Sequence, residues 1–179
     1  MTIRAFLGIL LLMSAAAVSG LAQTQDPKPG IIPTGLADGP YVHLMAQHHD
    51  EGIKMATLAT AKAANADVKA LAGRMLDRQR KELAELKQFK TTVAEDMAPR
   101  DRIVLKQMRI ESLEQATGAA FDRLFLSMMI EHHRDALTMT NGAKLVIPRV
   151  QDFAKTAAQR LNGELKEMQA ISKTGLTTS

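Results

Sequence analysis

Two stretches of this chain, YVHLMAQHHDEGIKM (41–55) and FLSMMIEHHRDALTM (125–139), are copies of one pattern set 84 residues apart. Each copy contains a His-His pair, a Met three residues before the pair and another Met further along. The stretches that follow them also match, at an offset of 82 residues. The matched positions are Val68, Ala72, Arg78, Glu82, Leu83 and Glu85 with Val150, Ala154, Arg160, Glu164, Leu165 and Glu167. A repeat this long exceeds a solenoid period and indicates a duplicated helical hairpin.

The chain from Tyr41 onward is rich in Ala, Leu, Met, Lys and Glu, which are strong helix formers. The predicted helices lie near 40–64, 67–96, 119–142 and 148–173, with a shorter helix near 101–116. Four long helices joined in pairs by short connections predict an all-α protein, a four-helix bundle with a short extra helix in the central connection. We expect up-down-up-down order, in which the first and third long helices run parallel on one diagonal.

The N-terminus has the pattern of a secretory signal peptide. In residues 1–22, Arg4 precedes an apolar run that ends in small residues, and cleavage is predicted after Ala22. A membrane anchor is the alternative, but the apolar run is short for a span of about 20 residues. We therefore expect a periplasmic or secreted protein that no longer contacts the membrane once the peptide is removed.

The next segment, residues 23–40, holds four of the six prolines. Proline at this density prevents a regular helix, so the segment is predicted to be a flexible Pro/Gly-rich leader. The bundle domain is predicted to cover residues 41–174, and residues 175–179 are predicted to be a disordered tail.

The composition excludes several classes of function. The 179 residues include no Cys, so a disulfide framework, a thiolate metal site and a Cys nucleophile are excluded. The formal net charge is only +4 and basic residues alternate with acidic ones, so nucleic-acid binding is not expected. No Ser-His-Asp order and no phosphate-binding Gly-rich loop is present, so no catalytic residue and no organic cofactor is predicted.

Four of the five histidines fall in the two His-His pairs. A structural role for each pair is the alternative, but their equivalent places in two repeats favour a shared site. Because positions i and i+3 are neighbours on a helix face, the preceding Met can join an imidazole on one ion, and packing in the core is the equal alternative for that Met. Which His of each pair faces inward is left open. The candidate metal ligands are His48, His49, His132, His133, Met45 and Met129.

Two glutamates are predicted to lie level with the His pairs. The midpoint between the first pair and Glu82 falls near residue 65, and the midpoint between the second pair and Glu164 falls near residue 148. Both midpoints are helix breaks, so folding each hairpin there brings each Glu to the height of its own pair. The two His pairs would then face each other across a diagonal of about 11–14 Å. We include Glu82 and Glu164 in the candidate site, with a solvated helix face as the alternative.

The donor types favour copper over iron. A di-iron bundle carries Glu three residues before its ligand His, but this chain has Met45, Ala46, Met129 and Ile130 at those positions. Thioether with imidazole suits copper, especially Cu(I), whereas imidazole alone also suits Cu(II), Ni(II) or Zn(II). Zinc, nickel and iron are therefore kept as alternatives. Binding is expected to be sensitive to pH near the ordinary imidazole pKa of about 6.5.

At these residues the chain resembles a known family, the bacterial domain of unknown function 305 family. The resemblance covers about residues 41–172. The matching stretches are MAQHHDEGIKMA (45–56), VKALAGRMLDRQRKEL (68–83), FDRLFLSMMIEHHRDAL (121–137) and VQDFAKTAAQRLNGELKEM (150–168). The layout also resembles a related family of periplasmic four-helix proteins that carry a single His in this place.

This resemblance implies a ferritin-like bundle, export, and a Met-x-x-His-His motif that takes part in copper binding and copper tolerance. The family's Gln-x-x-Glu motif is matched by Gln79 and Glu82, but the second repeat has Leu161 before Glu164, which is at odds with a symmetric two-Gln site. The favoured hypothesis is an exported metal-binding protein, most simply a copper buffer or chaperone. The alternatives are a metal-dependent oxidoreductase, which is less favoured, and a metal-free periplasmic interaction or stress protein. A homo-oligomer or a periplasmic protein partner is left open.

Overall fold

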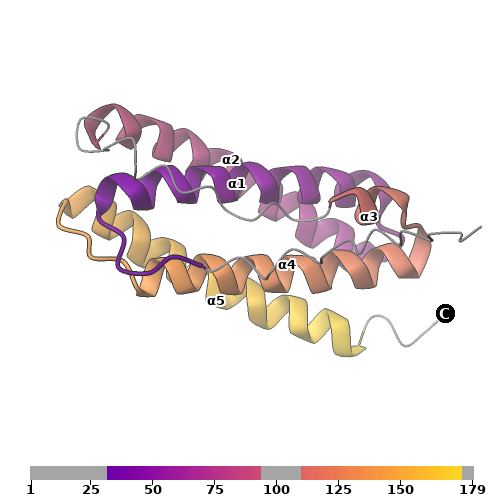
Figure 1. Cartoon of the computed structure of the whole chain (residues 1–179). Coiled ribbons are helices and arrows are strands. Elements are labelled where there is room, and N and C mark those ends of the chain that lie inside the picture. Colours follow the sequence, from indigo (N-terminus) through magenta and orange to yellow (C-terminus); the bar gives the residue numbers. More distant parts are fainter. Residues whose placement is uncertain (1–31, 94–109, 175–179) are drawn as a thin grey trace, which may run out of the picture.

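The computed structural model describes residues 32–93 and 110–174. Its helices run in pairs, and the first hairpin packs over the second (Figure 1). The helices are α1 (Asp38–Lys62), α2 (Ala66–Val93), α3 (Ile110–Gln115), α4 (Gly118–Asn141) and α5 (Pro148–Thr174). The prediction of a four-helix bundle built from two hairpins is confirmed, and the short helix is described over Ile110–Gln115. The predicted signal peptide at 1–22, residues 23–31 of the predicted leader, residues 101–109 of the predicted short helix and the predicted tail at 175–179 lie outside the described residues.

The order of the helices differs from the prediction. Tyr41, at the start of α1, bonds through its hydroxyl to Thr140 at the end of α4 (3.2 Å). Lys62, at the end of α1, donates to the carbonyl of Glu114, which lies just before α4. The helices α1 and α4 are therefore antiparallel neighbours and do not lie parallel on a diagonal. The end of α2 packs in the same apolar cluster as the end of α4, so α4 does not begin where α2 ends, as up-down-up-down order would require.

Two equivalent aspartates join the start of each hairpin to the loop of the other. Asp38 accepts hydrogen bonds from the backbone N–H groups of Val146 (3.1 Å) and Ile147 (3.0 Å) in the α4–α5 loop. Asp122 accepts in the same way from Ala64 (3.1 Å) and Asn65 (2.8 Å) in the α1–α2 loop. The two aspartates are 84 residues apart, so they extend the repeat beyond the stretches that the sequence analysis aligned. They fix how the two hairpins meet at both ends of the bundle.

The substitution Asp122→Ala is expected to lower the free energy of unfolding by about 2 to 4 kcal/mol. Asp122 is buried, and its loss leaves two backbone N–H groups without their charged acceptor. Urea denaturation followed by circular dichroism measures the change. Asp77→Ala, at an exposed position of α2, is the control and should change the free energy by less than about 0.5 kcal/mol. An equal loss in both variants would contradict this role of Asp122.

The bundle begins earlier than the sequence predicted. The helix α1 starts at Asp38, and Leu36 is buried against the bundle, whereas residues up to 40 were assigned to a flexible leader. Gly35, at a φ of +71°, donates to the carbonyl of Gly142, and the amide of Lys144 donates to the carbonyl of Leu36. Pro40 does not prevent the helix, because the first turn has N–H groups that need no helical partner. Residues 34–40 therefore belong to the bundle.

The core consists of two apolar clusters, one toward each end of the bundle. The first joins the start of α1 and α5 with the end of α2 and α4, and includes Leu44, Met45 and Phe153. The second joins the opposite ends of the same helices, and includes Met55, Phe125 and Met129. The His pairs lie at the level between the two clusters, so a polar layer crosses an otherwise apolar interior. Among the described residues, no helix is long and apolar enough to cross a membrane.

Candidate metal centre

All four paired histidines are buried in the polar layer, with exposed fractions between 1% and 6%. His48 on α1 and His132 on α4 lie against each other, with ring centroids 3.5 Å apart. The Nε2 of His48 donates to the carbonyl of His132 (2.8 Å), and the Nε2 of His132 donates to the carbonyl of His48 (2.9 Å). This reciprocal pair of hydrogen bonds joins the two repeats at the centre of the bundle. Both members of each His pair therefore face inward, which answers the question left open by the sequence.

The hydrogen bonds determine which nitrogen of the two central histidines carries the proton. A carbonyl oxygen only accepts, so Nε2 is protonated in both rings and the lone pair of the neutral form lies on Nδ1. Burial lowers the pKa of His48 from 6.5 to about 3, and the neighbouring His49 and His133 act in the same direction. Burial also lowers the pKa of His132 well below its usual value, with His48 adding to the effect. Protonation of these two rings is thus displaced from the expected pH of about 6.5 to more acid conditions.

The outer histidines each bond to the Glu of their own hairpin. The Nε2 of His49 lies 2.8 Å from Oε2 of Glu82, and the Nε2 of His133 lies 2.7 Å from Oε2 of Glu164. The structure thus places each Glu beside the predicted His. The Nδ1 of His49 donates to the carbonyl of Met45 (2.8 Å), whereas the Nδ1 of His133 is buried without a hydrogen-bond partner in the described part of the chain.

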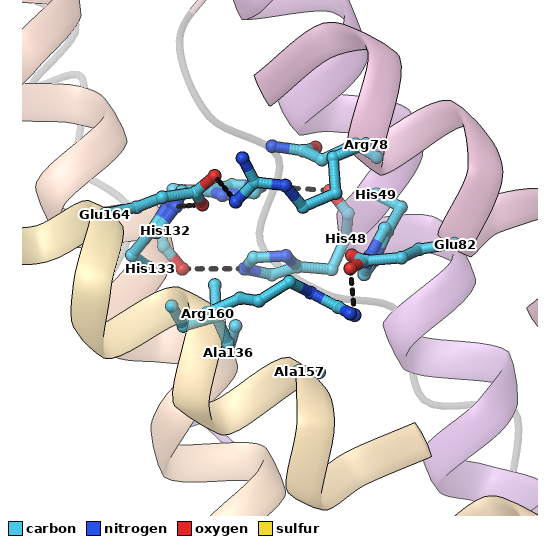
Figure 2. Close-up of a pocket in the computed structure, with 12 residues that line it drawn as sticks. His48, His49, Arg78, Glu82, His132, His133, Ala136, Ala157, Arg160 and Glu164 are labelled. Carbon is cyan, nitrogen blue, oxygen red and sulfur yellow. Dashed lines mark hydrogen bonds and ion pairs between the residues drawn. The ribbon is translucent and has the colours of Figure 1, made fainter. Parts of the chain in front are cut away.

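An arginine from the opposite hairpin completes each His–Glu pair. Arg160 of α5 forms an ion pair with Glu82 of α2, and Arg78 of α2 forms one with Glu164 of α5. Figure 2 shows the two glutamates on opposite sides of the histidines, each reached by the Arg of the other hairpin. The two charge pairs leave the layer with no formal net charge, apart from any charge on the outer histidines. Arg78 and Arg160 are equivalent positions of the sequence repeat, but their role is seen only in the structure.

The layer encloses a small cavity of about 20 Å³. This is room for one water molecule or one ion. The lining is made of the four histidines, both Arg–Glu pairs and a few uncharged side chains. The uncharged side chains are Gln79, Ala136, Ala157 and Leu161.

As they stand, no three His, Asp or Glu side chains of residues 32–93 and 110–174 converge on one point as metal ligands. The donors that are free to bind a cation are of another kind. His132 Nδ1, His133 Nδ1 and Gln79 Oε1 are buried and have no hydrogen-bond partner among the described residues. Imidazole nitrogens fit a transition-metal ion, whereas an amide oxygen is a harder donor that adds a weaker contact to such an ion.

Met45 and Met129 do not line the cavity. Both are completely buried in the apolar clusters, Met45 in the first and Met129 in the second. Only the backbone of Met45 contacts the site, because its carbonyl accepts the hydrogen bond from Nδ1 of His49. The structure therefore brings together the histidines and glutamates of the predicted site but places the two thioethers in the core on either side of it.

Gly52 and Gln79 distinguish the first repeat from the second. A Cβ at residue 52 would lie 2.0 Å from Oε1 of Gln79 and 2.8 Å from Cε1 of His132. Only glycine leaves room there for the Gln79 side chain to reach the inner histidines. At the equivalent positions the second repeat has Ala136 and Leu161. The sequence distinguishes Gln79 from Leu161, but that Gly52 makes room for Gln79 is seen only in the structure.

The comparisons with known proteins agree with this architecture. The family model described as "Domain of unknown function (DUF305)" matches residues 13–90 and 38–172. The chain belongs to the DUF305 family. The resemblance seen in the sequence is therefore confirmed. No curated protein matches this DUF305 chain.

Several solved structures share the fold of this DUF305 chain. CopM in its Cu(II)-bound form is 25% identical with a TM-score of 0.69, covering 79% of this chain and 99% of the other. CopM in an Ag-bound form is 26% identical with a TM-score of 0.66, covering 76% and 96%. The DUF305 fragment from Deinococcus radiodurans is 20% identical with a TM-score of 0.63, covering 79% and 99%. That last likeness extends to the fold alone.

Proposed function

We propose that this protein is an exported copper-binding protein that buffers or chaperones copper, with copper as its cargo. The observation that carries the proposal is that four buried histidines, from equivalent positions of two repeats, line one ion-sized cavity. Likeness to a protein solved with Cu(II), Cu(I) and Ag supports the same metal class. Export is proposed from the signal-peptide pattern of residues 1–22.

Two features of the cavity favour binding of a cation by imidazole. The lowered pKa values of His48 and His132 keep these rings neutral at physiological pH, so a proton does not compete for their lone pairs. The Nδ1 atoms of His132 and His133 are buried without a partner within the described residues, and an unsatisfied buried polar atom is costly. A bound metal ion would satisfy such atoms.

The charge of the cavity favours the monovalent ion. Arg78 and Arg160 balance Glu164 and Glu82, so no surplus carboxylate is available to offset an added charge. The penalty for burying an uncompensated charge is severe and is larger for a divalent ion. Imidazole nitrogens are good ligands for copper. We therefore propose Cu(I) as the form bound, on the strength of the imidazoles and the charge balance, since the thioethers lie outside the cavity.

The test is an anaerobic titration of the chain from Gln23 with Cu(I) against a competing chelator, with Cu(II), Zn(II) and Ni(II) alongside. The variant replaces all four paired histidines with Gln, which keeps hydrogen-bond donors in place of the rings. We expect its Cu(I) affinity to fall by at least about 100-fold. His43→Gln is the control, because His43 does not line the cavity, and its affinity should match that of the native protein.

Circular dichroism of both variants establishes that the helices are retained. Unchanged Cu(I) affinity in the fourfold variant would contradict the proposal. So would the absence of competitive binding in the native chain, a result that would favour a metal-free interaction protein. Oxidation of Cu(I) in air faster than that of the free ion would favour the oxidoreductase alternative.

A further inference from the structure

The cavity is less symmetric than the repeat that forms it. Each repeat contributes an equivalent set of linked Arg, Glu and His side chains. The buried donor atoms without a hydrogen-bond partner are not equivalent in the two repeats. In the second repeat, the Nδ1 atoms of both histidines are buried and unpartnered within the described chain. In the first repeat, His48 keeps the lone pair of its neutral form on Nδ1, because its Nε2 is the donor to His132. His49 donates through Nδ1 to the carbonyl of Met45, so that nitrogen is already used. The first repeat also offers the buried, unpartnered Oε1 of Gln79.

Gly52 determines where the Gln79 oxygen lies. The position that a Cβ of residue 52 would take is 2.0 Å from Gln79 Oε1 and 2.8 Å from His132 Cε1. The amide oxygen of Gln79 and the Cε1 edge of His132 therefore both lie against the Cα of Gly52, where a side chain would otherwise be. The second repeat cannot supply this donor, because Leu161 replaces the Gln and Ala136 replaces the Gly.

Three ring separations show which of these neighbouring histidines could share one ion. With a metal–nitrogen bond of about 2.0 Å and a ring centroid about 1.1 Å beyond the nitrogen, two imidazoles on one ion have centroids at most roughly 6.2 Å apart. The centroids of His132 and His133 are 6.0 Å apart, within this limit. Those of His48 and His49 are 6.5 Å apart, beyond it. Those of His48 and His132 are 3.5 Å apart, which would force an acute angle at the ion.

We infer that the cavity holds a single copper ion off centre, bound by the Nδ1 atoms of His132 and His133 with the amide oxygen of Gln79 as a third donor. This inference rests on the proposed function and assigns unequal roles to the two His pairs. His48 and His49 act as positioning residues. His48 holds the backbone of His132 through a hydrogen bond, and His49 links Met45 to Glu82.

The first test uses the unmodified sequence. The chain from Gln23, labelled with ¹⁵N in its histidines, is titrated with Ag(I), a monovalent ion that does not change oxidation state, and anaerobically with Cu(I). We expect the Nδ1 signals of His132 and His133 to shift and to saturate at one equivalent, while the Nδ1 signal of His49 stays in place. Saturation at two equivalents, or equal shifts in both His pairs, would overturn the inference.

The second test uses single substitutions read by Cu(I) competition. We expect His133→Gln to lose at least about 100-fold in affinity, and His49→Gln less than about tenfold. Gln79→Leu, which introduces the residue of the second repeat, should lose about tenfold, and Gly52→Ala should reproduce that loss by displacing Gln79. The matched controls are Gln151→Leu, whose Gln is exposed on α5, and Gly73→Ala, which has open space around it.

The outcomes separate this inference from the proposed function. If the native chain binds no copper, both fail. If it binds one ion but His49→Gln and His133→Gln lose equally, or Gln79→Leu binds as tightly as the native chain, only the inference fails. A folding defect in a variant is detected by circular dichroism, and the ¹⁵N titration of the native chain then decides.

Discussion

Replacing Glu164 with Leu is expected to destabilise the bundle by about 2 to 4 kcal/mol, mostly through the buried His133 N–H, because Arg78 is 32% exposed. Glu164 is the buried acceptor for His133 Nε2 and the ion-pair partner of Arg78. Its removal leaves a ring N–H in a fully buried site, where the His133 side chain is 1% exposed, and leaves the guanidinium of Arg78 without its carboxylate. Buried charges that lose their partner are strongly destabilising, whereas the same change on the surface costs little.

The control for this prediction is on the same helix. Glu167 pairs with Arg74 across the same two helices, but its side chain is 43% exposed and that of Arg74 is 51% exposed. Glu167→Leu should therefore change the free energy of unfolding by less than about 1 kcal/mol. Urea denaturation of both variants gives the comparison. Equal changes in the free energy of unfolding for the two variants would show that the burial of Glu164 and His133 adds no stability, contrary to the prediction.

Stability is expected to fall steeply below pH 6.5. His48 has its pKa lowered to about 3 and His132 well below its usual value, so both rings are neutral in the folded chain. In the unfolded chain the same rings take up a proton near pH 6.5, so unfolding binds protons and acid favours it. The contribution is fully present above pH 6.5 and is lost as the pH falls toward the folded-state values. Each ring adds about 1.4 kcal/mol per pH unit in that range.

Between pH 6 and pH 4 the His48 ring should remove about 2.5 kcal/mol, a large share of the net stability of a small domain. His132 should add to this loss, because its pKa is lowered as well. The measurement is the free energy of unfolding in urea at pH 7, 6, 5 and 4. The comparison is the variant in which His48 and His132 are both replaced by Gln, whose amide still donates to the facing carbonyl but does not titrate in this range. Between pH 6 and pH 4, the free energy of unfolding of this variant should fall by less than that of the native protein, and the difference should be at least the contribution of His48. Parallel curves for the two proteins would refute the prediction.

The local features of the fold were predictable because they depend on nearby residues. Helix-forming composition and the breaks near residues 65 and 148 placed the two hairpins, and the structure agrees within a few residues. Folding each hairpin at its break placed Glu82 beside His49 and Glu164 beside His133. The start of α1 was predicted too late because Pro40 was expected to prevent a helix. Pro40 lies in the first turn of α1, where proline is tolerated.

Contacts between the hairpins could not be predicted in this way. The repeat identified Arg78 and Arg160, but only the antiparallel packing of α2 and α5 lets each reach the Glu of the other hairpin. The predicted diagonal arrangement was wrong because sequence spacing does not determine the direction in which a long connection returns the chain. The same packing brings His48 and His132 into contact and turns Met45 and Met129 into the apolar clusters.

The sequence by itself determined the four long helices, the duplication and the concentration of histidines at equivalent positions. These follow from helix propensity and periodicity, which act over a few residues along the chain. Only the tertiary structure decided which histidine nitrogens lack a hydrogen-bond partner and which arginine pairs with each glutamate. It also decided that Gly52 makes room for Gln79. Those properties arise where side chains from different hairpins meet in a buried layer, and there the cost of an unpaired polar group selects the arrangement.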